Sequence, residues 1–342
     1  MGDPQQSRSR RDQGVTTTST ADRDEGRVSC GAALWPDLSA VALAPTLETL
    51  HLFSQVAGKA RLMLTPWENH GWHVPLYLTP RGLWTGLIPV KRRAFSLEFD
   101  LLAGALRFAV ADGSERTITL EGRSLASLYD GVLAAIRGSG IEVRIDPMPA
   151  EIEGAIPFDR DSAPRGFDLD VARTYWRALL EVHRVFQLFR TRFTGKCSPI
   201  HLFWGAFDLA VTRFSGRPAP PHPGGAPHMS DAVAREAYSR EVSSAGFWPN
   251  LGSAAGPCFY SYAYPPPAGY ADQPVSPAAA RFDAGLGEFI LPYSAVRGSA
   301  DPDAALLDFL QTTYEAAADR GGWDRVLLER EQGALGRPPT GS

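Results

Sequence analysis

The spacing of apolar residues along the chain predicts four long helices. Apolar side chains recur every three or four residues over 47–56, 124–138 and 171–193, which is the period of a helix with one buried face. The first of these helices should end at Gly58, because glycine is common directly after a helix. A fourth helix is expected over 301–322, where an aspartate cap precedes a proline in the first turn.

Between these helices, the alternation of apolar and polar residues predicts strands. Residues 93–120 have the pattern of a three-stranded meander with an Asp-Gly turn before the last strand. Residues 200–216 form a long apolar run that predicts one strand, with a break at Gly205. A short helix is expected over 235–247. Further strands are expected over 73–79, 141–145, 258–264 and 287–293.

The order of these elements predicts an α+β fold, in which long helices pack on one side of antiparallel sheets. Helix, strands and closing helix occur twice, over residues 46–145 and 168–322, and a Gly-Lys pair follows the first helix of each half. Two duplicated halves that share one core are therefore expected, within a single globular domain over 28–330. The polar segments 1–27 and 331–342 are expected to be disordered tails.

Composition and charge limit the kinds of partner that the protein can have. The formal net charge is -4, so no global positive charge attracts a nucleic acid. No run of about 18 apolar residues suits a membrane helix, and the first residues lack the apolar stretch of a secretory signal. The three cysteines are widely separated, which argues against a disulfide framework or a thiolate zinc site. The cytoplasm is therefore the expected location.

Four longer motifs resemble those of a bacterial family of unknown function. They are LHLFSQVAGKARLMLTPWENHGWHVPLYLTPRGL, GKCSPIHLFWGAFDLAVTRFSGRPAPPHPGG, EVSSAGFWPN and FYSYAYPPP, and the resemblance covers roughly residues 33 to 325. The family has no assigned activity, cofactor or partner, so the resemblance implies none. Its members often have Tyr-Ser-His-Glu where this chain has Tyr-Ser-Arg-Glu. Arg240 thus replaces a histidine, which puts in doubt any metal site that uses this position.

The stretch ENHGWH, residues 68–73, contains several side chains that can bind or react. His70 and His73 could form a metal site only with a third ligand, and no candidate stands at a signature spacing. The candidates are His201, His222, Asp208 and Glu241. No metal site is therefore predicted. In the structural alternative, Asn69 and His70 cap a turn, and His73 forms a hydrogen bond within the sheet.

Asp208 stands inside an apolar run, where an unpaired carboxylate is costly, so it needs a partner. Arg213, Lys196 or a histidine could neutralise it. His201 precedes it by an odd number of residues, which puts the two on opposite faces of one strand unless the chain is irregular at Gly205. Asp208 is then either half of a structural ion pair or a functional acid.

Cations and aromatic rings border the same strands. Such a mixture suits an anionic or sugar-like ligand, although tryptophan on an apolar strand more often belongs to the core. We expect a polar cleft between the halves, in an enzyme that acts on a small anionic molecule or in a non-catalytic small-molecule-binding or scaffold protein. The residues expected to catalyse are His73, His201, Asp208 and Arg213. The residues expected to bind the ligand are Lys59, Arg61, Asn69, His70, Trp72, Lys196 and Trp204.

The most specific of these expectations concerns His73 and Asp208. If the apolar residues of strand 73–79 face the core, His73 faces the cleft, where it should meet Asp208 in one polar pocket. Arg213 or Lys196 should neutralise the acid there. The sequence does not identify a reaction, a cofactor or an oligomeric state.

Overall fold

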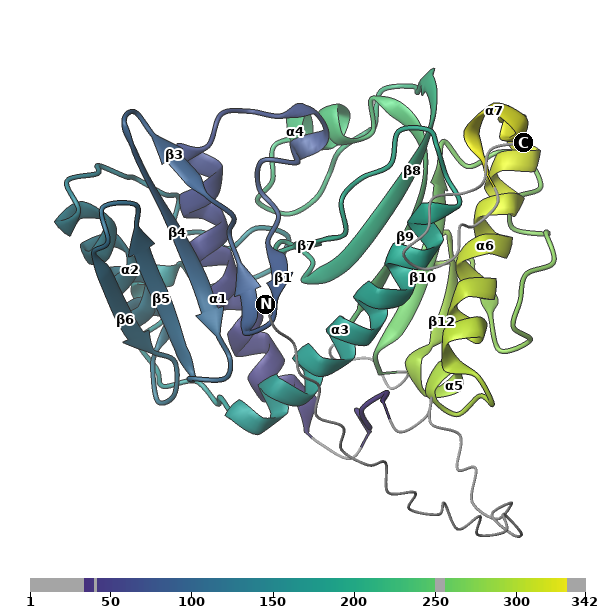
Figure 1. Cartoon of the computed structure of the whole chain (residues 1–342). Coiled ribbons are helices and arrows are strands. Elements are labelled where there is room, and N and C mark those ends of the chain that lie inside the picture. Colours follow the sequence, from purple (N-terminus) through teal and green to yellow (C-terminus); the bar gives the residue numbers. More distant parts are fainter. Residues whose placement is uncertain (1–33, 40–41, 250–255, 331–342) are drawn as a thin grey trace, which may run out of the picture.

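Two antiparallel sheets lie edge to edge in the protein (Figure 1). This computed structural model describes residues 34–39, 42–249 and 256–330. The expected tails over 1–27 and 331–342 lie outside the described residues.

Each sheet has six strands within the described residues, and neighbouring strands are mostly consecutive in the chain. The first sheet has the order β1-β2-β4-β5-β6, and β3 also pairs with β4. Its strands are β1 (Tyr77–Thr79), β2 (Gly82–Trp84), β3 (Ile88–Val90), β4 (Arg93–Asp100), β5 (Ala105–Val110) and β6 (Glu115–Thr119). The second sheet has the order β11-β12-β10-β9-β8-β7. Its strands are β7 (His201–Phe203), β8 (Asp208–Pro218), β9 (Arg240–Trp248), β10 (Cys258–Tyr264), β11 (Arg281–Asp283) and β12 (Glu288–Pro292).

Four long helices form a layer on one side of the sheets. They are α1 (Leu43–Leu64), α2 (Leu125–Gly138), α3 (Leu169–Thr191) and α6 (Pro302–Arg320). Neighbouring helices touch in the order α2, α1, α3, α6. The other described helices are short: η1 (Asn69–Gly71), η2 (Phe158–Arg160), α4 (Asp231–Ala237), α5 (Tyr293–Arg297) and α7 (Arg325–Leu328). The predicted α+β class, with long helices packed on antiparallel sheets, is confirmed.

Among the described residues, one antiparallel β-bridge joins the two sheets. Leu76 and Leu202 exchange two backbone hydrogen bonds of 2.8 Å, directly beside β1 and β7 (Figure 1). One hydrophobic core cluster contains buried residues from both halves. Each half also runs helix, antiparallel strands, helix in chain order. The duplication of 46–145 and 168–322 stays a prediction.

The helix ends follow local chemistry, with one exception. The Ser124 side chain caps α2, as the pattern over 124–138 predicted. Gly58 does not end the first helix, because α1 continues to Leu64. A Cβ at Gly58 would come within 2.3 Å of the Trp204 indole, so glycine serves close packing there. The predicted helix end was wrong, because glycine also occurs where another side chain packs closely against the helix backbone.

Two strand predictions and one helix prediction need correction. Residues 200–216 fold as a hairpin of β7 and β8, because a turn over 204–207 separates them. Residues 235–247 are mostly β9, since pairing with β8 and β10 on both sides overrides the helical period. Residues 141–145 form no strand, although Ile141, Val143 and Ile145 are buried in alternation. The apolar side chains of this segment alternate because every second one is buried, although the segment does not pair with another strand.

Candidate functional site

The register of the second sheet sorts its side chains onto two faces. Leu209 pairs with Phe247, which pairs with Phe259, and all three belong to the core shared with α3 and α6. Because successive residues of a strand point to opposite faces, their neighbours point away from the helices. We call that helix-free side the outer face. Its residues include His201, Phe203, Asp208, Ala210, Thr212, Phe214, Ser244, Gly246, Tyr260, Tyr262 and Glu288.

A long loop, residues 219–239 with α4 inside it, lies over the outer face; we call it the covering loop. The Tyr238 hydroxyl forms a 2.9 Å hydrogen bond with the Tyr262 hydroxyl of β10. The Ala237 carbonyl accepts a 3.0 Å hydrogen bond from Nδ1 of His70. The covering loop is therefore tied both to the sheet beneath it and to η1 from the first half.

Three carboxyl groups gather at one end of the outer face. Asp208 is buried and accepts a hydrogen bond from the Tyr260 hydroxyl. Its charge acts on Glu151, from the loop after α2, and on Glu288, the first residue of β12. We call these three acids the carboxyl cluster. Within the part of the chain that the structure describes, no lysine, arginine or histidine forms an ion pair with any of them.

Loss of water is the main cause that raises the pKa of each acid. Burial raises the pKa of Asp208 to about 6, although the hydrogen bond from Tyr260 lowers it. Burial, followed by the charge of Asp208, raises the pKa of both Glu151 and Glu288 to about 7. Glu151 is nevertheless accessible to solvent and Glu288 is half-buried. The cluster thus exchanges protons near neutral pH and can be reached from water.

Two glycines make room for the cluster. A Cβ at Gly246 would lie 2.3 Å from the Tyr260 hydroxyl, so Tyr260 crosses β9 over this glycine to reach Asp208 on β8. A Cβ at Gly205 would lie 1.8 Å from a carboxylate oxygen of Glu151. Any side chain at either position would displace one group of the cluster.

Phenol groups surround the acids. The rings of Tyr260 and Tyr262 stack with their centroids 6.0 Å apart. Tyr175 of α3 approaches from the helix layer, and its hydroxyl is buried without a hydrogen-bond partner. Burial, followed by the charge of Asp208, raises the pKa of Tyr175 well above its usual range. A donor with no protein partner beside an acid is available to a ligand or a water molecule.

A second polar cluster lies at the other end of β8. Nζ of Lys196 lies 2.6 Å from Nε2 of His70 and 5.0 Å from the ring centroids of both Trp72 and Phe214. His70 is buried, and burial lowers its pKa. Lys196 is exposed, and desolvation followed by the charge of Arg240 lowers its pKa. We call Lys196 and His70 the lysine–histidine pair.

His201 lies on the same face and is buried. Its ring centroid is 4.6 Å from that of Phe203, 6.3 Å from Tyr77 and 6.4 Å from Trp72. Neither ring nitrogen has a hydrogen-bond partner. Burial, followed by the charge of Arg61, lowers the pKa of His201 to about 3. The hairpin turn is the irregularity at Gly205 that puts His201 and Asp208 on one face.

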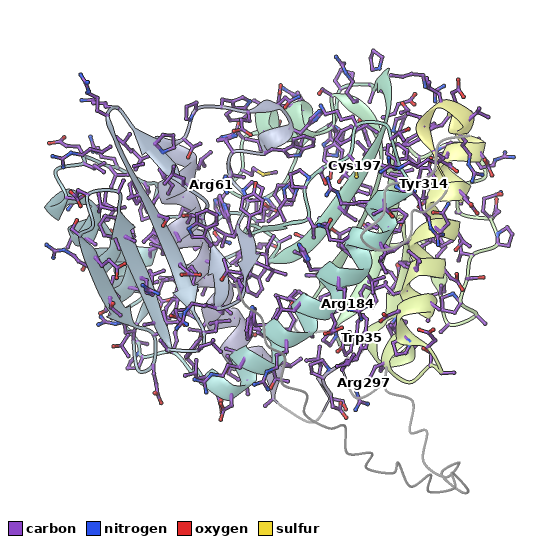
Figure 2. All side chains as sticks on the ribbon, in the orientation of Figure 1. Trp35, Arg61, Arg184, Cys197, Arg297 and Tyr314 are labelled. Atoms are coloured by element: carbon purple, nitrogen blue, oxygen red, sulfur yellow. The ribbon has the colours of Figure 1, made fainter. Side chains whose placement is uncertain are left out.

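The cations expected to neutralise Asp208 lie elsewhere. Arg213 and Asp208 are separated by an odd number of positions on β8, so their side chains point to opposite faces. Arg213 therefore faces the helices. Its guanidinium lies 3.4 Å from the Phe189 ring centroid and 4.3 Å from that of Tyr314, which is labelled near α6 in Figure 2. Lys196 belongs to the lysine–histidine pair. The prediction of an ion pair at Asp208 was wrong, because it used closeness in sequence and ignored the alternation of faces.

His73 lies in the loop before β1 and not in a strand. Its Nδ1 accepts a 3.3 Å hydrogen bond from the backbone of Glu68, and its ring packs on Trp67. Among the described residues, no hydrogen bond or ion pair joins His73 to Asp208. Their convergence in one pocket stays a prediction.

Three other predicted ligand residues bind backbone carbonyl groups. The accepting oxygens belong to Met148 for Lys59 (2.5 Å), Pro75 for Arg61 and Val74 for Trp204 (2.9 Å). Lys59 and Arg61 are buried on α1, and Arg61 lies between the two sheets (Figure 2). The contacts of Lys59 and Arg61 hold loops to the first helix, and that of Trp204 joins the β7–β8 turn to the loop before β1. Asn69 is exposed at the start of η1, and Trp72 lines the lysine–histidine pair.

The sequence analysis missed Glu151, Glu288 and Tyr260. Tyr260, Tyr262 and Tyr264 stand at every second position of a strand that was predicted, so their shared face was visible in the sequence. Glu288 opens another predicted strand, but nothing in its spacing relates it to Asp208. Glu151 lies in a loop with no period and gave no signal.

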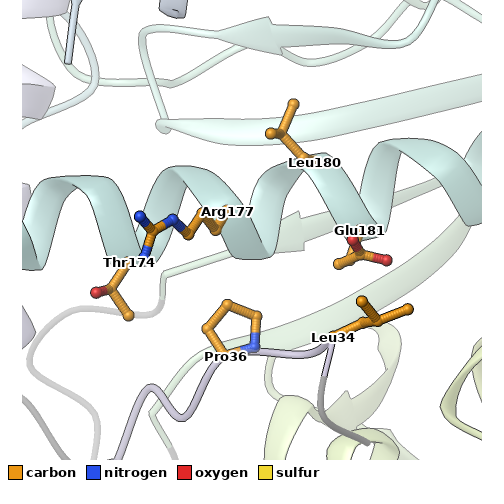
Figure 3. A pocket seen from close by; sticks show the side chains of 6 residues that line it. All are labelled: Leu34, Pro36, Thr174, Arg177, Leu180 and Glu181. Carbon is orange, nitrogen blue, oxygen red and sulfur yellow. The ribbon is translucent and has the colours of Figure 1, made fainter. Parts of the chain in front are cut away.

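Two hollows lie outside the carboxyl cluster, and the described residues contain no metal-binding group. Among the described residues, no group of three or more His, Cys, Asp or Glu side chains could hold a metal ion. A hollow of about 340 Å³ lies between Leu34, Pro36 and α3 (Figure 3). Another, of about 260 Å³, lies near Tyr264 and Trp323. No helix in the described part of the chain is long and apolar enough to cross a membrane.

Comparison with known proteins identifies a family but no function. The model of a family of unknown function (DUF5996) matches residues 35–330, so the chain belongs to this family. No curated protein and no solved structure matches the chain.

Proposed function

We propose that this member of a family of unknown function binds a small organic cation, an amine or a guanidine, at the carboxyl cluster. The proposal is supported by one observation above all: the charge of Asp208 acts on both Glu151 and Glu288, and no described cation of the protein forms an ion pair with any of the three acids. A bound cation would supply the charge that the protein does not. This replaces the anionic ligand expected from the sequence, because the cations grouped with Asp208 lie elsewhere.

The electrostatic argument concerns the charge of the cluster near neutral pH. Two unit charges 4 Å apart interact by about 4 kcal/mol at an effective dielectric constant of 20. Ionised carboxyl groups that share a desolvated site therefore repel one another, which adds to the effect of burial in raising the pKa values of Glu151 and Glu288. A cation bound among them stabilises the ionised forms and lowers those pKa values. Binding should consequently release protons.

The aromatic surroundings suit an organic cation better than a metal ion. Tyrosine rings attract ammonium and guanidinium groups by cation–π interaction, worth about 0.5–2 kcal/mol depending on desolvation. Tyr260 and Tyr262 provide stacked rings, and Tyr238 of the covering loop packs on Tyr262 with centroids 6.2 Å apart. The ligand class is therefore a small amine or guanidine with its charged group among the acids.

The cluster also has acids suited to proton transfer. A general acid or base works best when its pKa is near the working pH, and burial brings Glu151 and Glu288 to about 7. An enzyme that deprotonates the bound amine is one form of the proposal, and a non-catalytic binder is the other. We place the protein in the cytoplasm, since the free Cys197 and Cys258 suit a reducing compartment.

Calorimetric titration of the full chain with agmatine, putrescine and succinate at pH 7.5 tests the proposal. We expect a cation to bind and succinate not to bind. The heat should change with the ionisation enthalpy of the buffer, because protons are released. Glu288→Gln should weaken cation binding roughly tenfold, the equivalent of about 1.4 kcal/mol. Consumption of the amine would then distinguish the enzyme from the binder.

Glu115→Gln is the matched control. Glu115 is an exposed carboxyl on β6 of the first sheet, so its loss should leave the affinity unchanged. Equal weakening by both variants would indicate a general charge effect and contradict a specific site. Absence of binding by both cations would refute the proposal.

A further inference from the structure

Lys196 is one of only three lysines in the chain, the others being Lys59 and Lys91. Lys59 is buried and donates to a backbone carbonyl. Lys91 is exposed in the turn between β3 and β4. Lys196 differs from both, because it is exposed and its amine is hydrogen-bonded to a histidine.

The hydrogen bonds of His70 determine which of its nitrogens can accept a proton. Nδ1 lies 3.0 Å from the Ala237 carbonyl, which can only accept, so Nδ1 carries the hydrogen. Burial favours the neutral ring. Nε2 is then an unprotonated acceptor, 2.6 Å from Nζ of Lys196. The covering loop therefore orients a base towards the lysine amine.

The surroundings of the amine act on its proton in opposite directions. No carboxylate forms an ion pair with Lys196 in the described part of the chain, although the charge of Glu236 favours the ammonium form. Arg240 acts against it, and so does the loss of water between the rings of Trp72 and Phe214. The two rings attract an ammonium ion, which keeps the amine in place.

We propose that Lys196 is a nucleophilic amine that forms an imine with an aldehyde or a ketone, with His70 as the base that takes its proton. The site is distinct from the carboxyl cluster and goes beyond the cation-binding function. Nε2 of His70 accepts a proton from the ammonium group, and the freed Nζ lone pair forms a bond to the carbonyl carbon. The two protons that remain on Nζ pass to the carbonyl oxygen, the C–O bond breaks and water leaves, which gives a C=N bond.

The aromatic walls define the class of carbonyl compound. Trp72 and Phe214 lie at equal distances from Nζ, so a flat apolar body attached to the carbonyl group can pack against one of them. An aromatic aldehyde fits this description and serves as the probe.

The test is reductive trapping of the full chain with benzaldehyde and sodium cyanoborohydride at pH 7.5, followed by peptide mapping. Lys196 should be labelled severalfold faster than Lys91, since within the described chain only Lys196 has a neighbouring base that can take the proton of its amine. Equal labelling of the two lysines would overturn the proposal. This comparison uses the unmodified protein and depends on no variant.

His70→Asn tests the role of the base. His70 has a φ of 61°, a conformation that asparagine tolerates well, so the backbone can be retained. The excess labelling of Lys196 over Lys91 should disappear. His222→Asn is the control, because His222 belongs to the covering loop and stacks on Tyr238, and no hydrogen bond between it and Lys196 occurs among the described residues. Undiminished labelling in His70→Asn would contradict the assignment of His70 as the base.

Discussion

Two buried aspartates, Asp100 and Asp208, occupy corresponding kinds of position in the two sheets but have opposite surroundings. Asp100 ends β4 and Asp208 begins β8, and both point away from the helix layer. An oxygen of Asp100 lies 2.6 Å from Nη2 of Arg81 and 3.8 Å from Nη1 of Arg107. Asp208 has a tyrosine hydroxyl and two further acids instead.

The difference separates a structural acid from a functional candidate. Asp100 also accepts hydrogen bonds from the amides of Leu102 and Ala103, so it fixes the turn after β4 as well as the arginines. Its loss should harm the fold. Burial makes the ionised form of Asp208 costly. The hydrogen bond from the Tyr260 hydroxyl offsets part of this cost, and no described cation of the protein forms an ion pair with Asp208. A group kept at such a cost is a candidate for ligand contact.

The largest effect should come from exchanging each aspartate for asparagine. Asp100→Asn should lower the free energy of unfolding by about 2–3 kcal/mol, because charged hydrogen bonds to Arg81 and to the turn are lost. Asp208→Asn should change it by less than about 1 kcal/mol, since the amide oxygen can still accept from Tyr260. Urea denaturation at pH 7.5 measures both. If Asp208→Asn lowered the free energy of unfolding by about 3–5 kcal/mol, Asp208 would be a structural charge like Asp100. The difference between the two aspartates would then not hold.

His201→Phe should have the next largest effect, and it should depend on pH. The folded pKa of about 3 is below the unfolded value of 6.5, so stability is lost as pH falls from 6.5 towards 3. The strands of the first sheet contain no histidine. The free energy of unfolding should be measured by urea denaturation at pH 7 and at pH 4.5. Its decrease between these two pH values should be smaller in His201→Phe than in the parent protein by roughly 2 kcal/mol. An unchanged acid loss would show that His201 is hydrated or partnered in solution.

Glu288→Gln should give the smallest effect, with the opposite sign. The folded pKa of about 7 is above the usual 4.5, so the cost of the charge appears as pH rises from 4.5 through 7. At pH 8 the variant should be more stable by roughly 1 kcal/mol, a value reduced for the partial exposure of this side chain. At pH 4 it should match the parent protein.

The control for that measurement is again Glu115→Gln. Glu115 pairs with Arg107 at 3.3 Å on the exposed side of the first sheet. Its loss should change stability by at most about 0.5 kcal/mol and should never stabilise at high pH. If Glu288→Gln destabilised the protein at pH 8, the carboxyl cluster would not be electrostatically strained.

The fold was more predictable from sequence than the site, because helices and meanders repeat with short periods. Apolar residues over 171–193 lie on one face of a helix, and this pattern predicted α3. The alternation of apolar and polar residues over 93–120 predicted β4 to β6. The position of a strand within a sheet depends on pairing partners, and β9 was therefore mistaken for a helix.

Part of the site could be predicted because its residues lie in two conspicuous motifs. His70, Trp72 and Lys196 were all expected to contact a ligand, and they form one cluster. The carboxyl cluster could not be predicted, since Glu151 and Glu288 come from a loop and a strand far from Asp208 in sequence. Only the register of the sheet and the space above Gly205 bring them together.

The single bridge between Leu76 and Leu202 has a consequence for motion within the protein. If the halves separate transiently, these two hydrogen bonds must break while each sheet keeps its own ladder of bonds. Their amide hydrogens would then exchange with deuterium at the rate of that opening, which is distinct from fraying at sheet edges and from global unfolding. The hydrogen-exchange rates of these two leucine amides therefore report how often the two halves separate.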